Sequence, residues 1–68
     1  MSHYDYTEAK RVCELEPPYY AIIMAAMWNA DSFNAEKLRR AFPDVWDELQ
    51  ARYNAPGGYL PGEEVKAY

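Results

Sequence analysis

Apolar side chains recur at helical spacing along most of the chain, and prolines and short polar segments divide this pattern into pieces. Between Leu38 and Tyr53 the apolar residues follow one another at intervals of three and four, and the pattern continues across Pro43 as if the proline were absent. Such intervals place side chains on one face of a helix. No segment shows the strict alternation of a half-buried strand. The pattern therefore predicts an all-α protein.

The N-terminal part of the sequence predicts a first helix from about Tyr6 to Leu15. Asp5 and Glu8 have the spacing of a capping box, with Asp in place of the usual Ser or Thr. The helix should end before Pro17, because a proline pushes the residue that precedes it out of the α region. The apolar face of this helix carries Tyr6, Ala9, Val12 and Cys13.

The next segment, "YYAIIMAAMWNA", is apolar on nearly every face and predicts a central helix that Pro18 opens in its first turn. Residues Asn29 to Ser32 form a tight turn in this interpretation. Asp31 or Ser32 is expected to cap a third helix, which continues through "NAEKLRRAF".

Pro43 interrupts the long amphipathic pattern. Inside a helix a proline removes one hydrogen bond and clashes with the preceding turn, which costs about 3 kcal/mol. We therefore expect Phe42 to end the third helix and Pro43 to open a fourth, so that the rod becomes an elbow whose two arms face one core. On the second arm the residues expected to point inward are Trp46, Leu49 and Tyr53.

Glycine and proline turns follow the fourth helix. Gly57 or Gly58 can take the positive φ that ends a helix, and the turn "LPGE" is expected to lay Tyr59 and Leu60 back on the bundle. Residues 1–4 and 64–68 are expected to be flexible. The sequence thus predicts one small domain, residues 1–68, with the fold of a compact bundle of three to four short helices, a Pro-broken C-terminal helix pair and a Gly/Pro-turn tail.

Composition adds limits on function. Half of the 68 residues are hydrophobic and 16% are aromatic, which is enough apolar mass for a folded chain. The net charge of −4 gives no general attraction to nucleic acid or to anionic membranes. The longest nearly apolar run, Pro17 to Trp28, is shorter than the roughly 20 residues that span a bilayer. The N-terminus has no signal-peptide pattern, so we expect a cytoplasmic protein.

The segment from about Tyr20 to Glu63 resembles small uncharacterised proteins encoded by actinobacteriophages, mycobacteriophages especially. Its most specific elements are "LRRAFPDVWDELQARY" and "NAPGGYLPGE". The resemblance covers about two-thirds of the chain and supplies no activity, cofactor or catalytic residue. It implies a phage gene product in the cytoplasm of a host bacterium, acting on a host or phage protein.

The side chains that could act as a nucleophile, a base or a metal ligand do not form a convincing enzyme site. His3 lies near the terminus, and Cys13 lies on the apolar face of the first helix. Asp44, Asp47 and Glu48 are the common partners of a helix dipole at the start of a helix, and no loop offers further oxygen ligands for a cation. We therefore expect no catalytic residue, no cofactor and no metal.

Surplus aromatic residues favour a protein-binding role. Seven Tyr and two Trp exceed what so small a core can hold, and Tyr and Trp dominate interface energies. If the first helix and the Tyr59–Leu60 segment do not cover the central helix, an aromatic face stays exposed. This face could bind a partner protein or a second copy of the chain. Its candidate residues are Tyr19, Tyr20, Met24, Met27 and Trp28.

A helix-turn-helix that binds DNA is the alternative. The short turn between the second and third helices fits such a motif, with Ala25 and Asn29 at suitable positions. Acidic neighbours and the negative net charge oppose this function. The third helix would present Asn34, Lys37, Arg39 and Arg40 to the DNA.

Overall fold

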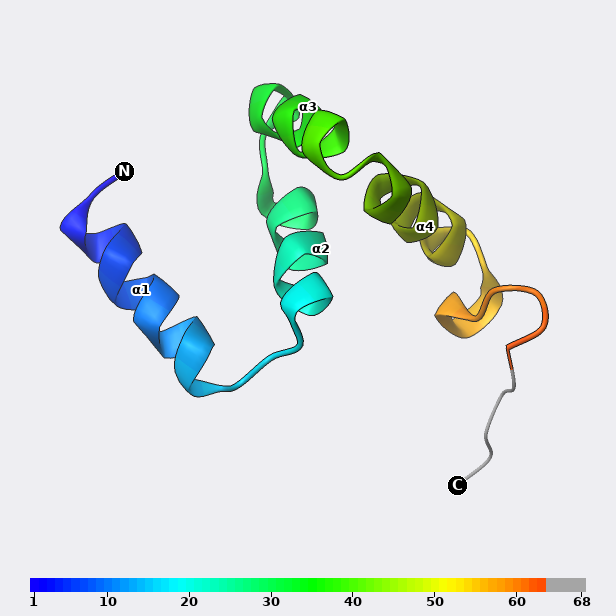
Figure 1. Ribbon diagram of the computed structural model, residues 1–68, viewed down its shortest axis with the longest axis horizontal. Helices are drawn as coiled ribbons and strands as arrows, with labels where there is room; N and C mark the ends of the chain where they lie inside the picture. Colours follow the sequence, from blue (N-terminus) through cyan, green and yellow to red (C-terminus); the bar gives the residue numbers. More distant parts are fainter. Residues whose placement is uncertain (64–68) are drawn as a thin grey trace.

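A computed structural model describes residues 1–63 of the chain, and within them all regular structure is helical (Figure 1). The all-α prediction is confirmed. Residues 64–68, which we expected to be flexible, lie outside the described part. The elements are α1 (His3–Glu14), α2 (Tyr19–Asn29), α3 (Ser32–Ala41), α4 (Pro43–Tyr53) and a short 3₁₀ turn, η1 (Pro56–Gly58).

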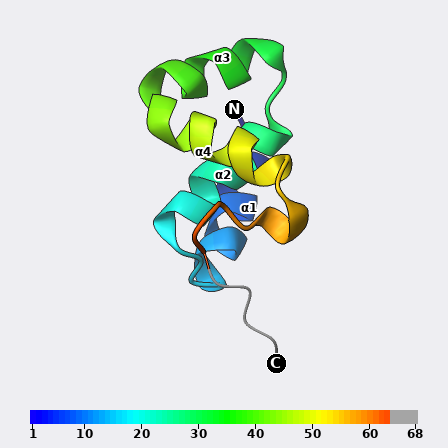
Figure 2. The ribbon, with the colours of Figure 1, turned by 90° about the vertical axis from the view of Figure 1, so that its right-hand side faces the viewer.

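Helices α2, α3 and α4 form the packed part of the molecule. Each of the three packs against the other two, and α4 also holds η1; Figure 2 shows α3 and α4 stacked above and in front of α2. The two best-buried side chains are Met27 of α2, 5% exposed, and Leu49 of α4, 4% exposed. Half-buried residues surround this pair, among them Ile23, Leu38, Phe42, Val45 and Trp46.

Side-chain caps fix two helix starts. Asp31 accepts a hydrogen bond from the backbone N–H of Asn34 at 2.8 Å, which confirms it as the cap of α3. For α1 the predicted capping residue is wrong: Ser2 is the cap, and its hydroxyl accepts from the backbone N–H of Asp5 at 3.2 Å. Because Ser2 already provides a cap with an acid three residues later, the helix begins at His3 instead of Tyr6.

The elbow at Pro43 forms as predicted. Phe42 leaves the helical conformation with φ −132° and ψ 63°, and Pro43 occupies the first turn of α4, where its missing N–H costs nothing. Leu38 and Phe42 on one arm and Leu49 on the other turn toward a shared core. Tyr53 does not: it is 74% exposed.

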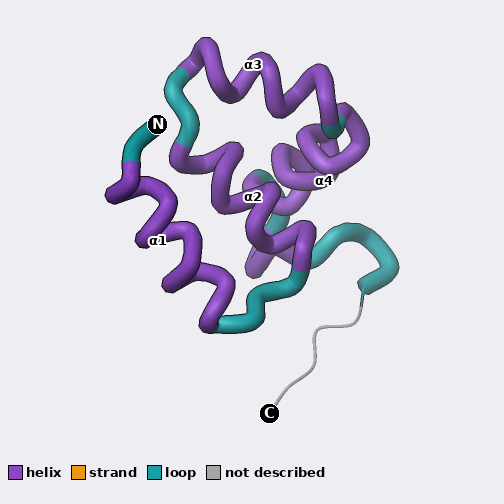
Figure 3. Tube along the Cα trace, turned by 60° about the vertical axis from the view of Figure 1, so that its left-hand side comes forward, coloured by secondary structure: helices purple, strands orange, loops and turns teal. Residues whose placement is uncertain are grey.

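Helix α1 stands apart from this core. It has no buried residue and packs against no other described element; in Figure 3 it runs alongside α2 on the side away from α4. The radius of gyration is 14.3 Å, where a compact chain of this length has about 11 Å. The predicted helices are present, but the bundle is only modestly compact because three helices share the core.

Candidate protein-binding surface

The aromatic residues predicted to face a partner lie mainly on the surface of α2. Tyr19 is 60% exposed, Tyr20 56% and Trp28 66%. The two tyrosine rings meet edge to face with their centroids 5.2 Å apart. Met24 is half-buried, and Met27 belongs to the core, so the exposed part of the predicted set is Tyr19, Tyr20 and Trp28. Neither α1 nor the Tyr59–Leu60 segment covers these residues.

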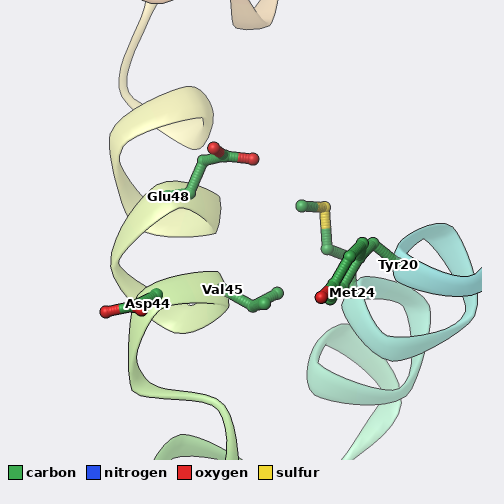
Figure 4. Close-up of a pocket in the computed structure, with 5 residues that line it drawn as sticks. All are labelled: Tyr20, Met24, Asp44, Val45 and Glu48. Carbon is green, nitrogen blue, oxygen red and sulfur yellow. The ribbon is translucent and has the colours of Figure 1, made fainter.

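A shallow groove runs between α2 and α4 beside this aromatic group (Figure 4). Its volume is about 230 Å³, and its lining residues are Tyr20, Met24, Asp44, Val45 and Glu48. Figure 4 shows Val45 of α4 facing the Tyr20 ring of α2 across the groove, with Met24 and Glu48 above them. The groove therefore combines apolar side chains with the Glu48 carboxylate on its α4 side, while the Asp44 carboxylate points away from α2.

The exposed face of α1 is a second apolar surface. The sequence did not predict it as a binding surface, because its apolar residues were expected to face the core. A shallow hollow on this helix is lined by Tyr6, Ala9, Lys10, Cys13 and Glu14. The Lys10 ammonium lies 5.8 Å from the centre of the Tyr6 ring. The sequence feature that could have indicated the separation of α1 from the core is Pro17–Pro18, because two consecutive prolines impose an extended connection after the helix.

The cations of α3 are engaged by neighbours on the same helix. Glu36 accepts from Arg39 Nε at 2.8 Å and from Arg40 Nε at 3.3 Å. The hydrogen bond from Arg39, with the charges of both arginines, lowers the pKa of Glu36 to about 2. Lys37 lies over the Phe33 ring at 4.6 Å. Asn34 is held at the Asp31 cap. The four residues of the DNA-binding interpretation thus lie on one helix, but a carboxylate neutralises part of their charge.

We expect no submicromolar binding to duplex DNA at physiological salt, because DNA affinity rests largely on uncompensated cations. Fluorescence anisotropy with a panel of labelled duplexes of different sequence measures this. Glu36→Gln removes the carboxylate that both arginines contact, and it should therefore strengthen any nonspecific binding at low salt. Tight, sequence-selective binding by the parent that disappears in Arg39→Ala would establish the helix-turn-helix interpretation instead.

The other candidate chemical groups do not converge. His3 lies at the start of α1 near Tyr6, with ring centroids 6.3 Å apart, and Cys13 is exposed near the end of that helix. Asp44, Asp47 and Glu48 lie in the first half of α4. Within residues 1–63 no group of three or more His, Cys, Asp or Glu side chains is arranged to hold a metal ion.

Arg52 fastens the C-terminal turns to α4, an arrangement that the sequence did not suggest. One guanidinium nitrogen donates to the carbonyl of Gly58 and to Glu63 Oε1, both at 2.8 Å, and the other donates to Glu63 Oε2 at 2.7 Å. Glu63 also accepts from the backbone N–H of Leu60 at 2.8 Å. The hydrogen bonds from Arg52 and Leu60 lower the pKa of Glu63 to about 2.

The turns allow this contact because glycines supply the required backbone. Gly57, Gly58 and Gly62 all have positive φ, of 63°, 75° and 89°. Side chains other than glycine rarely adopt such angles. The prediction of a positive φ at Gly57 or Gly58 is confirmed, and both residues adopt it.

Protection of the Leu60 amide from hydrogen exchange should depend on the Arg52–Glu63 pair. Because the pKa of Glu63 is lower in the folded state, the protection is complete above the ordinary carboxyl pKa of about 4.5 and is lost as the pH falls through about 2. Arg52→Met should remove the protection at neutral pH. Glu48→Gln is the matched control, since Glu48 contacts the same guanidinium only at 3.4 Å. Equal Leu60 exchange in Arg52→Met and the parent would contradict this role.

Comparison of the chain with protein-family models, curated proteins and solved structures gives no match. A separate search of the described helices finds none with the length and apolar character needed to cross a membrane.

Proposed function

We propose that this chain is a small, non-enzymatic protein-protein interaction module. The observation that supports it best is the detachment of α1, whose apolar residues pack against nothing in the described chain. Large apolar surfaces on a folded protein commonly mark sites where a partner docks. The exposed Tyr20 and Trp28 add the residue types that contribute most to interface energy.

The resemblance to actinobacteriophage proteins supports a proposal about the origin of the protein and the place where it acts. We infer a phage gene product that acts in the cytoplasm of its host, with a host protein, a phage protein or a second copy of itself as partner.

Capture of a partner from host lysate tests the proposal. The tagged protein is incubated with lysate of an actinobacterial host, and the bound proteins are identified by mass spectrometry. Tyr20→Ser and Trp28→Ser should each reduce the captured amount at least several-fold. Tyr53→Ser is the matched control, because Tyr53 is similarly exposed but lies outside the aromatic group. A partner lost equally with all three variants, or no partner and no self-association at all, contradicts the proposal.

A further inference from the structure

We propose that two copies of this chain associate by exchanging α1, so that the Tyr6–Cys13 face of α1 from one copy docks in the α2–α4 groove of the other. This inference rests on the proposed binding function and names its partner as a second copy. In a two-fold dimer both contacts form, because the same two surfaces meet twice.

The connection after α1 explains why the helix leaves its own core. Leu15 closes α1, and Glu16 then takes φ 51°, a left-handed conformation that is uncommon outside glycine. Pro17 and Pro18 follow, and Pro18 is extended with ψ 146°. A short, strained and proline-stiffened connection favours exchange of the preceding element between copies, since it resists folding that element back as a hairpin.

Helix α1 is similar in length to the two helices that flank the groove. Helix α1 has 12 residues and is about 18 Å long, and the groove lies between two helices of 11 residues, each about 16 Å long. The hollow on α1 holds the small side chains of Ala9 and Cys13, which permit close approach of a neighbouring helix. Met24 and Val45 offer an apolar floor opposite them.

One pair of opposite charges can form across the two surfaces. Lys10 borders the hollow on α1 and has no carboxylate partner among the ion pairs of residues 1–63. Asp44 and Glu48 border the groove on α4. Figure 4 shows the Asp44 carboxylate pointing away from α2, so docking of α1 would bring Lys10 to Glu48 alone. Glu14 lines the same hollow as Lys10, so the charges of the two surfaces set the orientation of the helix more than its affinity.

The surface area of the single chain agrees with this pairing. The chain exposes 6002 Å², whereas a compact monomer of 7.9 kDa exposes about 4,400 Å². A standard interface buries about 800 Å² on each partner. Exchange of α1 in both directions would cover an area of this order, because each chain contributes one helix face and one groove.

Crosslinking between two chains with one cysteine each tests the arrangement. The natural chain supplies Cys13, and its mixing partner carries Cys13→Ser with Val45→Cys in the groove. A short bismaleimide is added, and the heterodimer is quantified by mass. The control partner carries Cys13→Ser with Asp47→Cys, which lies on the same helix outside the groove. We expect crosslinking to position 45 to exceed crosslinking to position 47 at least tenfold. Neither product can form within one chain.

Sedimentation equilibrium provides the second measurement. The parent should be dimeric at micromolar concentrations. Ala9→Asp should be monomeric, and its far-UV circular dichroism should lose no more than the contribution of the 12 residues of α1. A parent that stays monomeric at every concentration, or that crosslinks equally to positions 45 and 47, overturns α1 exchange. If such a monomer still captures a lysate protein through Tyr20, the binding function survives and only the second copy as partner is wrong.

Discussion

Replacing Leu49 by alanine is expected to unfold much of the protein, at a cost of about 2 to 5 kcal/mol. Leu49 is one of the two best-buried side chains, and it lies on the helix that contacts α2, α3 and η1. Small domains often have a total stability of only about 5 kcal/mol. Loss of this one side chain therefore removes a large share of the free energy that holds three helices together.

Thermal and urea unfolding followed by circular dichroism measure this effect. Tyr53→Ala is the matched control on the same helix, and we expect it to change the free energy of unfolding by less than about 0.5 kcal/mol, because its side chain is 74% exposed. Equal destabilisation by the two substitutions would show that α4 is not held through Leu49.

Removal of the cap of α3 is expected to have the next largest effect on stability. Asp31→Ala leaves the backbone N–H of Asn34 without its 2.8 Å acceptor and should cost about 1 kcal/mol. Asp31→Asn retains an oxygen acceptor and should cost much less. The unfolding temperatures of the three proteins test this order. A parent-like midpoint for Asp31→Ala would mean that packing against α2 and α4 alone fixes the start of α3.

Local rules predicted much of the fold. The elbow at Pro43 and the cap at Asp31 follow from the properties of single residues and their immediate neighbours, and both are present. The start of α1 was misplaced because Ser2 and Asp5 compete as caps, and propensity does not rank them decisively. Such competition shifts a boundary by a few residues without changing the element.

The candidate surface was harder to predict, because it depends on which faces meet. Helix α2 is apolar all round, so its sequence cannot show that Met27 is buried while Tyr20 and Trp28 are exposed. Tyr53 continues the apolar pattern of α4, yet its side chain is 74% exposed. The contact between Arg52 and Glu63 spans eleven residues and several turns, and no local periodicity encodes it.

The detachment of α1 also bears on folding and turnover. Helices α2 to α4 follow one another directly and pack on their sequence neighbours, so they should assemble rapidly, as domains with local contacts do. In the α1 exchange that we propose, docking on a second copy is a bimolecular step whose rate rises with concentration. An isolated helix of 12 residues is marginal in water, and a segment that opens to coil is where proteases cut first. Newly made, dilute chains would therefore be cut by proteases at the N-terminus, whereas chains produced abundantly would survive intact. The amount of protein synthesised would then set the lifetime of each molecule.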